Sequence, residues 1–124
     1  MSKCDVEEVA KCPMRDLINR LGDKWSMLVL VSLDSNDGTA MRFSEVLRSV
    51  HGISQRMLTL TLRHLERDGI VTRHIYPEVP PRVEYALTVR GKNFLVPVKN
   101  LVDWLRGEWP NIEKSRQTYD QKGE

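Results

Sequence analysis

The stretch ISQRMLTLTLRHLERDG, residues 53–69, decides the fold. Ser54 can accept hydrogen bonds from the unpaired backbone amides at the start of a helix, and Gly69 is typical of a residue that ends one. Leucines recur between them at helical spacing, on a face that must point inward: Leu58, Leu62 and Leu65. The stretch therefore predicts an amphipathic helix whose outward face is fixed.

That outward face carries side chains suited to reading base pairs: Gln55, Arg56, Thr59, Leu60 and Arg63. Arginine can donate bidentately to guanine and glutamine to adenine, and a threonine or leucine methyl can contact the thymine methyl in the major groove. An ordinary solvated helix face has the same spacing, so the context has to separate the two alternatives.

Two strands follow this helix. Residues 71–76 and 82–87 alternate β-branched and aromatic side chains, as a hairpin does. The PEVPP between them holds three prolines, so the tip cannot fold back into the sheet and should project, with Arg82 at its base. Helix, turn, helix and hairpin is the winged-helix order, in which the second helix enters the major groove and the hairpin contacts the backbone or minor groove. This order favours DNA over a winged helix that binds only protein.

Two helices are expected upstream. Cys12-Pro13 is typical of a helix start, an apolar stripe follows, and Gly22 is expected to end it in a left-handed cap. The stripe consists of Met14, Leu17, Ile18 and Leu21. Asp23 can cap the next helix, whose side chains are so apolar that burial nearly all round is expected.

A short connection links these helices to the decisive stretch. Residues 34–39 predict a loop and residues 41–43 a short strand, and Ser44 is expected to cap a short helix. The chain then turns at His51-Gly52.

A long helix is predicted over residues 89–110, with Thr88 as its N-cap. Its apolar side chains recur at intervals of three and four: Phe94, Val98, Leu101, Leu105 and Trp109. Pro97 should kink the helix. The excess apolar surface favours a dimer interface, with core packing as the alternative. Residues 111–124 are polar and are expected to fray.

The whole chain of 124 residues is therefore expected to be one domain. Residues 12–40 supply N-terminal helices, 41–88 the helix-turn-helix and wing, 89–110 a dimerisation helix and 111–124 a tail. The fold class is mainly α with a small antiparallel β wing.

Charge is segregated along the chain. Residues 42–92 hold nine Lys and Arg against five Asp and Glu, although the whole chain has a net charge of only +2. A basic centre fits a phosphate-binding surface. Two cysteines and no apolar run of membrane length favour a soluble, cytoplasmic protein with reduced thiols.

Enzymatic function finds little support. His51, His64 and His74 show no metal-ligand spacing, and no phosphate loop or nucleophile elbow occurs. A thiol peroxidase using Cys12 would lack an α/β scaffold and a partner base. We therefore predict no catalytic residue, no metal and no cofactor.

Several strings of this sequence resemble the HxlR-type regulators, a branch of the MarR-like winged-helix repressors of bacteria. The strings, within residues 12–104, are Cys12-Pro13, Gly22 to Trp25, Arg42 to Glu45, Gly52 to Thr59 and Tyr76 to Thr88. The resemblance implies a homodimeric repressor that binds an inverted-repeat operator through Gln55, Arg56, Thr59, Arg63 and Arg82. Lys24, Arg42, Ser44 and Ser54 in these strings are further candidates for DNA contact. Asp23 and Leu60 depart from the family pattern, so the operator sequence does not transfer.

Cys12 is a candidate redox or electrophile sensor. It directly precedes Pro13 at a helix start, where the helix dipole favours the reactive thiolate. The resemblance implies sensing of oxidants, quinones or aldehydes by a cysteine at this position, and a small-molecule effector is the alternative. A small buried residue is the simpler interpretation. Cys4 would lie about 12 Å away on one continuous helix, so only a disulfide between subunits stays open.

Overall fold

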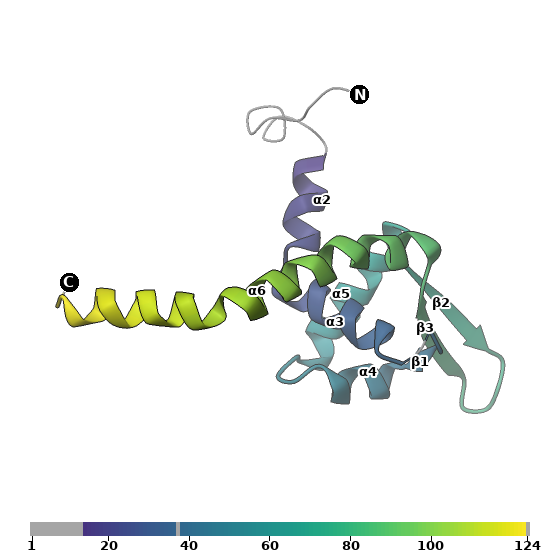
Figure 1. The fold of residues 1–124 in the computed structure, drawn as a ribbon. Helices are drawn as coiled ribbons and strands as arrows, with labels where there is room; N and C mark the ends of the chain where they lie inside the picture. Colours follow the sequence, from purple (N-terminus) through teal and green to yellow (C-terminus); the bar gives the residue numbers. More distant parts are fainter. Residues whose placement is uncertain (1–13, 37, 124) are drawn as a thin grey trace, which may run out of the picture. The chain divides into compact units, whose positions relative to one another are not determined.

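The computed structural model describes residues 14–36 and 38–123 (Figure 1). Its elements are, in chain order, α2 (Met14–Leu21), α3 (Lys24–Asp34), β1 (Met41–Arg42), α4 (Phe43–Ser49), α5 (Gln55–Arg67), β2 (Val71–Tyr76), β3 (Arg82–Leu87) and α6 (Val89–Gln121). One compact unit ends at Lys92 and a second begins at Asn93. The predicted class, mainly α with a small antiparallel sheet, is confirmed.

The first unit is built around α3. This helix packs against α4, α5 and β3, and α5 packs in turn against β2. The leucines predicted to point inward from α5 are buried together with the apolar residues of α3, α4 and the start of the hairpin. The most deeply buried side chains of the unit are Val29, Leu30, Leu33, Val46, Leu58, Leu62, Leu65 and Val71.

The sheet has the strand order β1-β3-β2 and is antiparallel throughout. Both hairpin strands have the predicted bounds, and they pair from Val71 opposite Leu87 to Tyr76 opposite Arg82. The hairpin extends away from the helices of its unit (Figure 1). The short β1 adds to the other edge of β3, with Arg42 opposite Glu84.

Three predicted helix ends are confirmed. Asp23 Oδ2 accepts from the backbone amides of Trp25 and Ser26, and Ser54 Oγ accepts from Met57 N at 3.0 Å. Gly69 has φ +75°, the left-handed conformation expected of a residue that ends a helix.

The predicted cap of α4 is wrong. Ser44 lies inside the helix, and Arg42 is the N-cap residue, its backbone amide donating to Glu45 Oε1 at 2.9 Å. The strand β1 explains the shift, because it holds Arg42 in the extended conformation that an N-cap position needs.

Gly22 does not adopt the predicted left-handed conformation. A Cβ at this position would lie 3.0 Å from the carbonyl oxygen of Ile18, so a close backbone approach accounts for the glycine instead.

α3 is not buried nearly all round. Leu28 and Val31 are each 44% exposed, because the packing of α4, α5 and β3 leaves one side of α3 open. These two side chains line a groove with the end of α4.

α6 is longer than predicted. It continues beyond residue 110 to Gln121 and includes both Pro97 and Pro110. The segment expected to fray therefore forms the last three turns of the helix. None of the described residues belongs to a helix apolar and long enough to cross a membrane.

Candidate nucleic-acid interface

α5 presents its predicted reading face, the outward side chains expected to contact base pairs. Gln55, Arg56, Leu60 and Arg63 are exposed, whereas the leucines on the opposite side are buried. Charged and amide side chains at the start of an exposed helix are the arrangement by which a recognition helix contacts base edges.

Two predicted contact residues already have a partner in α5 itself. The Ser54 hydroxyl accepts from Met57 N, and Thr59 Oγ1 donates to the Gln55 carbonyl oxygen at 2.9 Å. The hydroxyl proton of Thr59 is thereby used, which leaves its methyl group and oxygen lone pairs for a base edge. Ser54 serves first to start the helix at the right residue.

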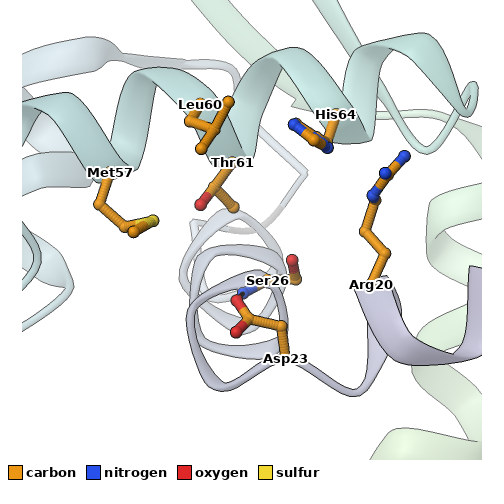
Figure 2. Close-up of a pocket in the computed structure, with 7 residues that line it drawn as sticks. All are labelled: Arg20, Asp23, Ser26, Met57, Leu60, Thr61 and His64. Atoms are coloured by element: carbon orange, nitrogen blue, oxygen red, sulfur yellow. Dashed lines mark hydrogen bonds between the residues drawn. The ribbon is translucent and has the colours of Figure 1, made fainter. Parts of the chain in front are cut away.

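Leu60 of the reading face also lines a cavity next to α5. This open cavity has a volume of about 230 Å³ (Figure 2). It is lined on one side by Met57, Leu60, Thr61 and His64 of α5, and on the other by Arg20 of α2, the cap residue Asp23 and Ser26 of α3. Arg20 Nη1 also lies 3.7 Å from Asp68 Oδ2, at the end of α5. Leu60 thus lies where the predicted reading face meets the cavity.

Charged side chains connect α5 to the wing. Arg73 Nε of β2 lies 3.6 Å from Glu66 Oε2 of α5, and Arg73 is opposite Tyr85 in the sheet. Burial raises the pKa of Tyr85; Glu66 also raises it, and the positive charges of Arg73 and Arg63 oppose the rise. A salt bridge between exposed side chains thus joins α5 to the hairpin.

These connecting residues were missed by the sequence analysis. Alternation along β2 and β3 shows which side chains share a face, but only the observed register brings Arg73 opposite Tyr85. The salt bridge to Glu66 additionally requires the packing of α5 against β2.

Arg82 lies at the base of the wing tip, as predicted, and it is engaged there. Its guanidinium stacks over the Tyr76 ring, 4.1 Å from the centroid. Its Nη2 lies 3.3 Å from Glu78 Oε2 and its Nε 3.4 Å from Glu84 Oε2. Among the described residues its buried Nε has no hydrogen-bond partner, so charge attraction alone holds the pair with Glu84.

A groove brings Arg82 together with two other candidates. The start of α4 and the wing tip enclose about 470 Å³, lined by Arg42, Phe43, Ser44 and residues 78–83. Lys24 is not part of it; its Nζ lies 4.3 Å from the centroid of the Trp25 ring, and its side chain is exposed.

The remaining candidates lie elsewhere. Leu101, Leu105 and Trp109 of α6 are exposed, Phe94 is half-buried and Val98 is buried. Cys12, the predicted sensor, lies outside the described residues. Within the described ranges, no group of His, Cys, Asp and Glu could hold a metal ion.

A projecting hairpin next to an exposed helix of a helix-turn-helix defines a winged helix-turn-helix protein of the transcription-regulator class. The family model described as HxlR-like helix-turn-helix matches residues 20–113. The chain belongs to this family, as its sequence motifs indicated.

The chain is similar along most of its length to other transcriptional regulators, some of them with solved structures. An uncharacterized HTH-type transcriptional regulator of Methanothermobacter thermautotrophicus is 48% identical over 93 residues, 75% of this chain and 69% of that protein. The solved structure of the putative transcriptional regulator ytfH from Salmonella typhimurium has a TM-score of 0.77 and 36% identity, covering 87% of this chain and 94% of that one. The redox regulator HypR in its oxidized form has a TM-score of 0.64 and 40% identity, covering 77% and 96%.

Proposed function

We propose that this chain is a transcriptional repressor that binds an inverted-repeat operator in duplex DNA as a homodimer. The observation that carries the proposal is the exposed reading face of α5, with Gln55, Arg56 and Arg63, next to a projecting wing that carries Arg73 and Arg82. Each N-terminal half of α5 would enter a major groove, and the groove that holds Arg42, Ser44 and Arg82 would follow the adjacent backbone. Acting on DNA, the protein would work in the cytoplasm.

The test is a gel-shift titration of the purified protein with duplex DNA from the region upstream of its own gene. The proposal expects a discrete complex that resists excess random-sequence DNA and weakens as salt rises. A winged helix that binds only protein would give no such complex. Reporter expression from that region should rise when the protein is removed; a fall would identify an activator.

The dimer part of the proposal is supported by apolar surface on two helices. Met14, Leu17 and Ile18 of α2 are exposed, although they form one stripe, and no residue of α2 is buried. α6 likewise exposes Leu101, Leu105 and Trp109. Apolar helix stripes of this length are typical of surfaces covered in a dimer.

Cys12 is proposed as the sensor that releases the operator. Support comes from its position before Pro13 and from the similarity to a protein named a redox regulator. An adduct or a disulfide between subunits there would change the relative orientation of the two recognition helices.

The sensor is tested by titrating wild type and Cys12→Ser with diamide, a quinone or an aldehyde while operator binding is followed. Loss of binding by the wild type alone is expected. An equal response of both proteins, or no response, would exclude Cys12 and favour an unmodified small-molecule effector.

A further inference from the structure

Arg82, the wing residue predicted to contact DNA, is already paired with carboxylates of the wing itself. Arg82 carries one positive charge, and the carboxylates of Glu78 and Glu84 lie 3.3 and 3.4 Å from its guanidinium. One face of the guanidinium is also covered by the Tyr76 ring. A DNA phosphate approaching Arg82 therefore meets two negative charges around a single positive one.

The two carboxylates differ in how they are held. Glu84 lies in β3, between Arg42 of β1 and His74 of β2, and its side chain is 19% exposed. Glu78 lies in the tip, and its side chain is 50% exposed. Glu84 is thus the more enclosed of the two carboxylates, whereas the exposed Glu78 is the one that can more readily leave Arg82 by side-chain rotation.

The turn keeps Glu78 close to its partner. The backbone amide of Glu78 donates to the Tyr76 carbonyl oxygen at 2.8 Å, and Tyr76 is opposite Arg82 in the hairpin. The Glu78 carboxylate thus lies beside the Arg82 guanidinium, in the groove that also contains Arg42.

We propose that Glu78 is an intramolecular competitor of the DNA phosphate for Arg82, and that it lowers the affinity of the wing for every duplex. This inference rests on the proposed DNA-binding function. Because a phosphate contact carries no sequence information, the effect of Glu78 should be the same for operator and random DNA. Binding to every duplex would then be weaker, and the ratio of operator affinity to random-DNA affinity would stay the same.

The experiment compares Glu78→Gln with wild type in fluorescence anisotropy titrations against a labelled random-sequence duplex at low salt. Glutamine keeps the shape and removes the charge, and an exposed ion pair of this kind is worth a roughly two- to fivefold change in affinity. Glu78→Gln should therefore bind about two- to fivefold more tightly. Thermal unfolding by circular dichroism verifies that each variant is folded.

Two further variants separate the local effect from net charge. Glu113→Gln makes the same charge change at an exposed position of α6 and should alter affinity much less. In an Arg82→Gln background, Glu78→Gln should lose most of its effect, because the competed cation is gone.

Equal gains from Glu78→Gln and Glu113→Gln, or an unchanged gain in the Arg82→Gln background, would overturn the proposal while leaving DNA binding intact. A failure of all the folded proteins to bind any duplex would overturn both this proposal and the proposed function.

Discussion

Single side chains on α5 divide into those that build the helix and those that remain available. Ser54 and Thr59 use their hydroxyl groups within the helix, whereas the exposed guanidinium groups of Arg56 and Arg63 make no hydrogen bond that helix formation requires. Base discrimination should therefore depend most on the two arginines, since each can donate two hydrogen bonds to a guanine.

Arg56→Ala or Arg63→Ala should relax operator discrimination. The loss of a bidentate base contact costs about 1–3 kcal/mol at one base pair and should flatten the preference at that position. The base preference is measured from the affinities of each protein for a set of operator duplexes with single-base changes. Arg67→Ala, in the last turn of α5, removes the same charge and should leave discrimination unchanged. If both test variants discriminate between operator variants as well as wild type does, this face of α5 does not contact the bases.

At the level of elements, the wing is a charged hairpin joined to α5 by the salt bridge between Glu66 and Arg73. Arg82→Gln should weaken binding to all sequences. If Arg82 meets a phosphate, the slope of log affinity against log salt should become shallower by about one. Arg106→Gln, on the exposed side of α6, is the charge-matched control. An unchanged slope would mean that Arg82 only shapes the wing.

The start of α6 is fixed against the residue that precedes β2 by a close backbone approach. The Ile70 carbonyl oxygen accepts from Thr88 N at 3.0 Å, and the Thr88 hydroxyl donates to the Gly69 carbonyl oxygen at 2.6 Å. A Cβ on Gly91 would collide with the Ile70 oxygen. Because this carbonyl is held by a backbone hydrogen bond and cannot easily move aside, Gly91→Ala should lower the free energy of unfolding by about 1–3 kcal/mol.

Gly107→Ala is the matched control in the same helix, where no described atom lies within 4 Å of the added Cβ. Alanine favours a helix, so this variant should gain up to about 1 kcal/mol. Urea unfolding measures the free energy of unfolding of both variants and of wild type. Equal effects of the two substitutions would contradict the packing at Gly91.

The elements that local sequence patterns determine were predictable. Ser54, the three inward leucines and both hairpin strands follow from capping and periodicity, and each is confirmed. Two of the failures depended on contacts distant in sequence: β1, paired with β3, moves the cap of α4 to Arg42, and neighbouring elements leave Leu28 exposed. The carboxylates around Arg82 could not be predicted either, because only the hairpin geometry brings Glu78 and Glu84 to one guanidinium.

For the whole molecule, the central expectation is a two-fold dimer on a two-fold operator. Sedimentation at micromolar concentration should show a dimer, and the operator should contain half-sites about one helical turn apart, or a multiple of that. Leu105→Glu places a charge in the exposed stripe of α6 and should shift the equilibrium to monomer. Tyr119→Glu is an exposed control nearer the end of α6. A monomeric wild type with full affinity for one half-site would exclude the dimer.

The most direct measurement is selection of binding sites from a random duplex pool by the purified protein, followed by titration of the enriched sequence at several salt concentrations. The account predicts enrichment of an inverted repeat whose affinity exceeds that of random DNA by about a thousandfold or more and falls linearly on a log–log plot against salt. A pool that yields no common sequence, with no salt-dependent binding to any duplex, would contradict it.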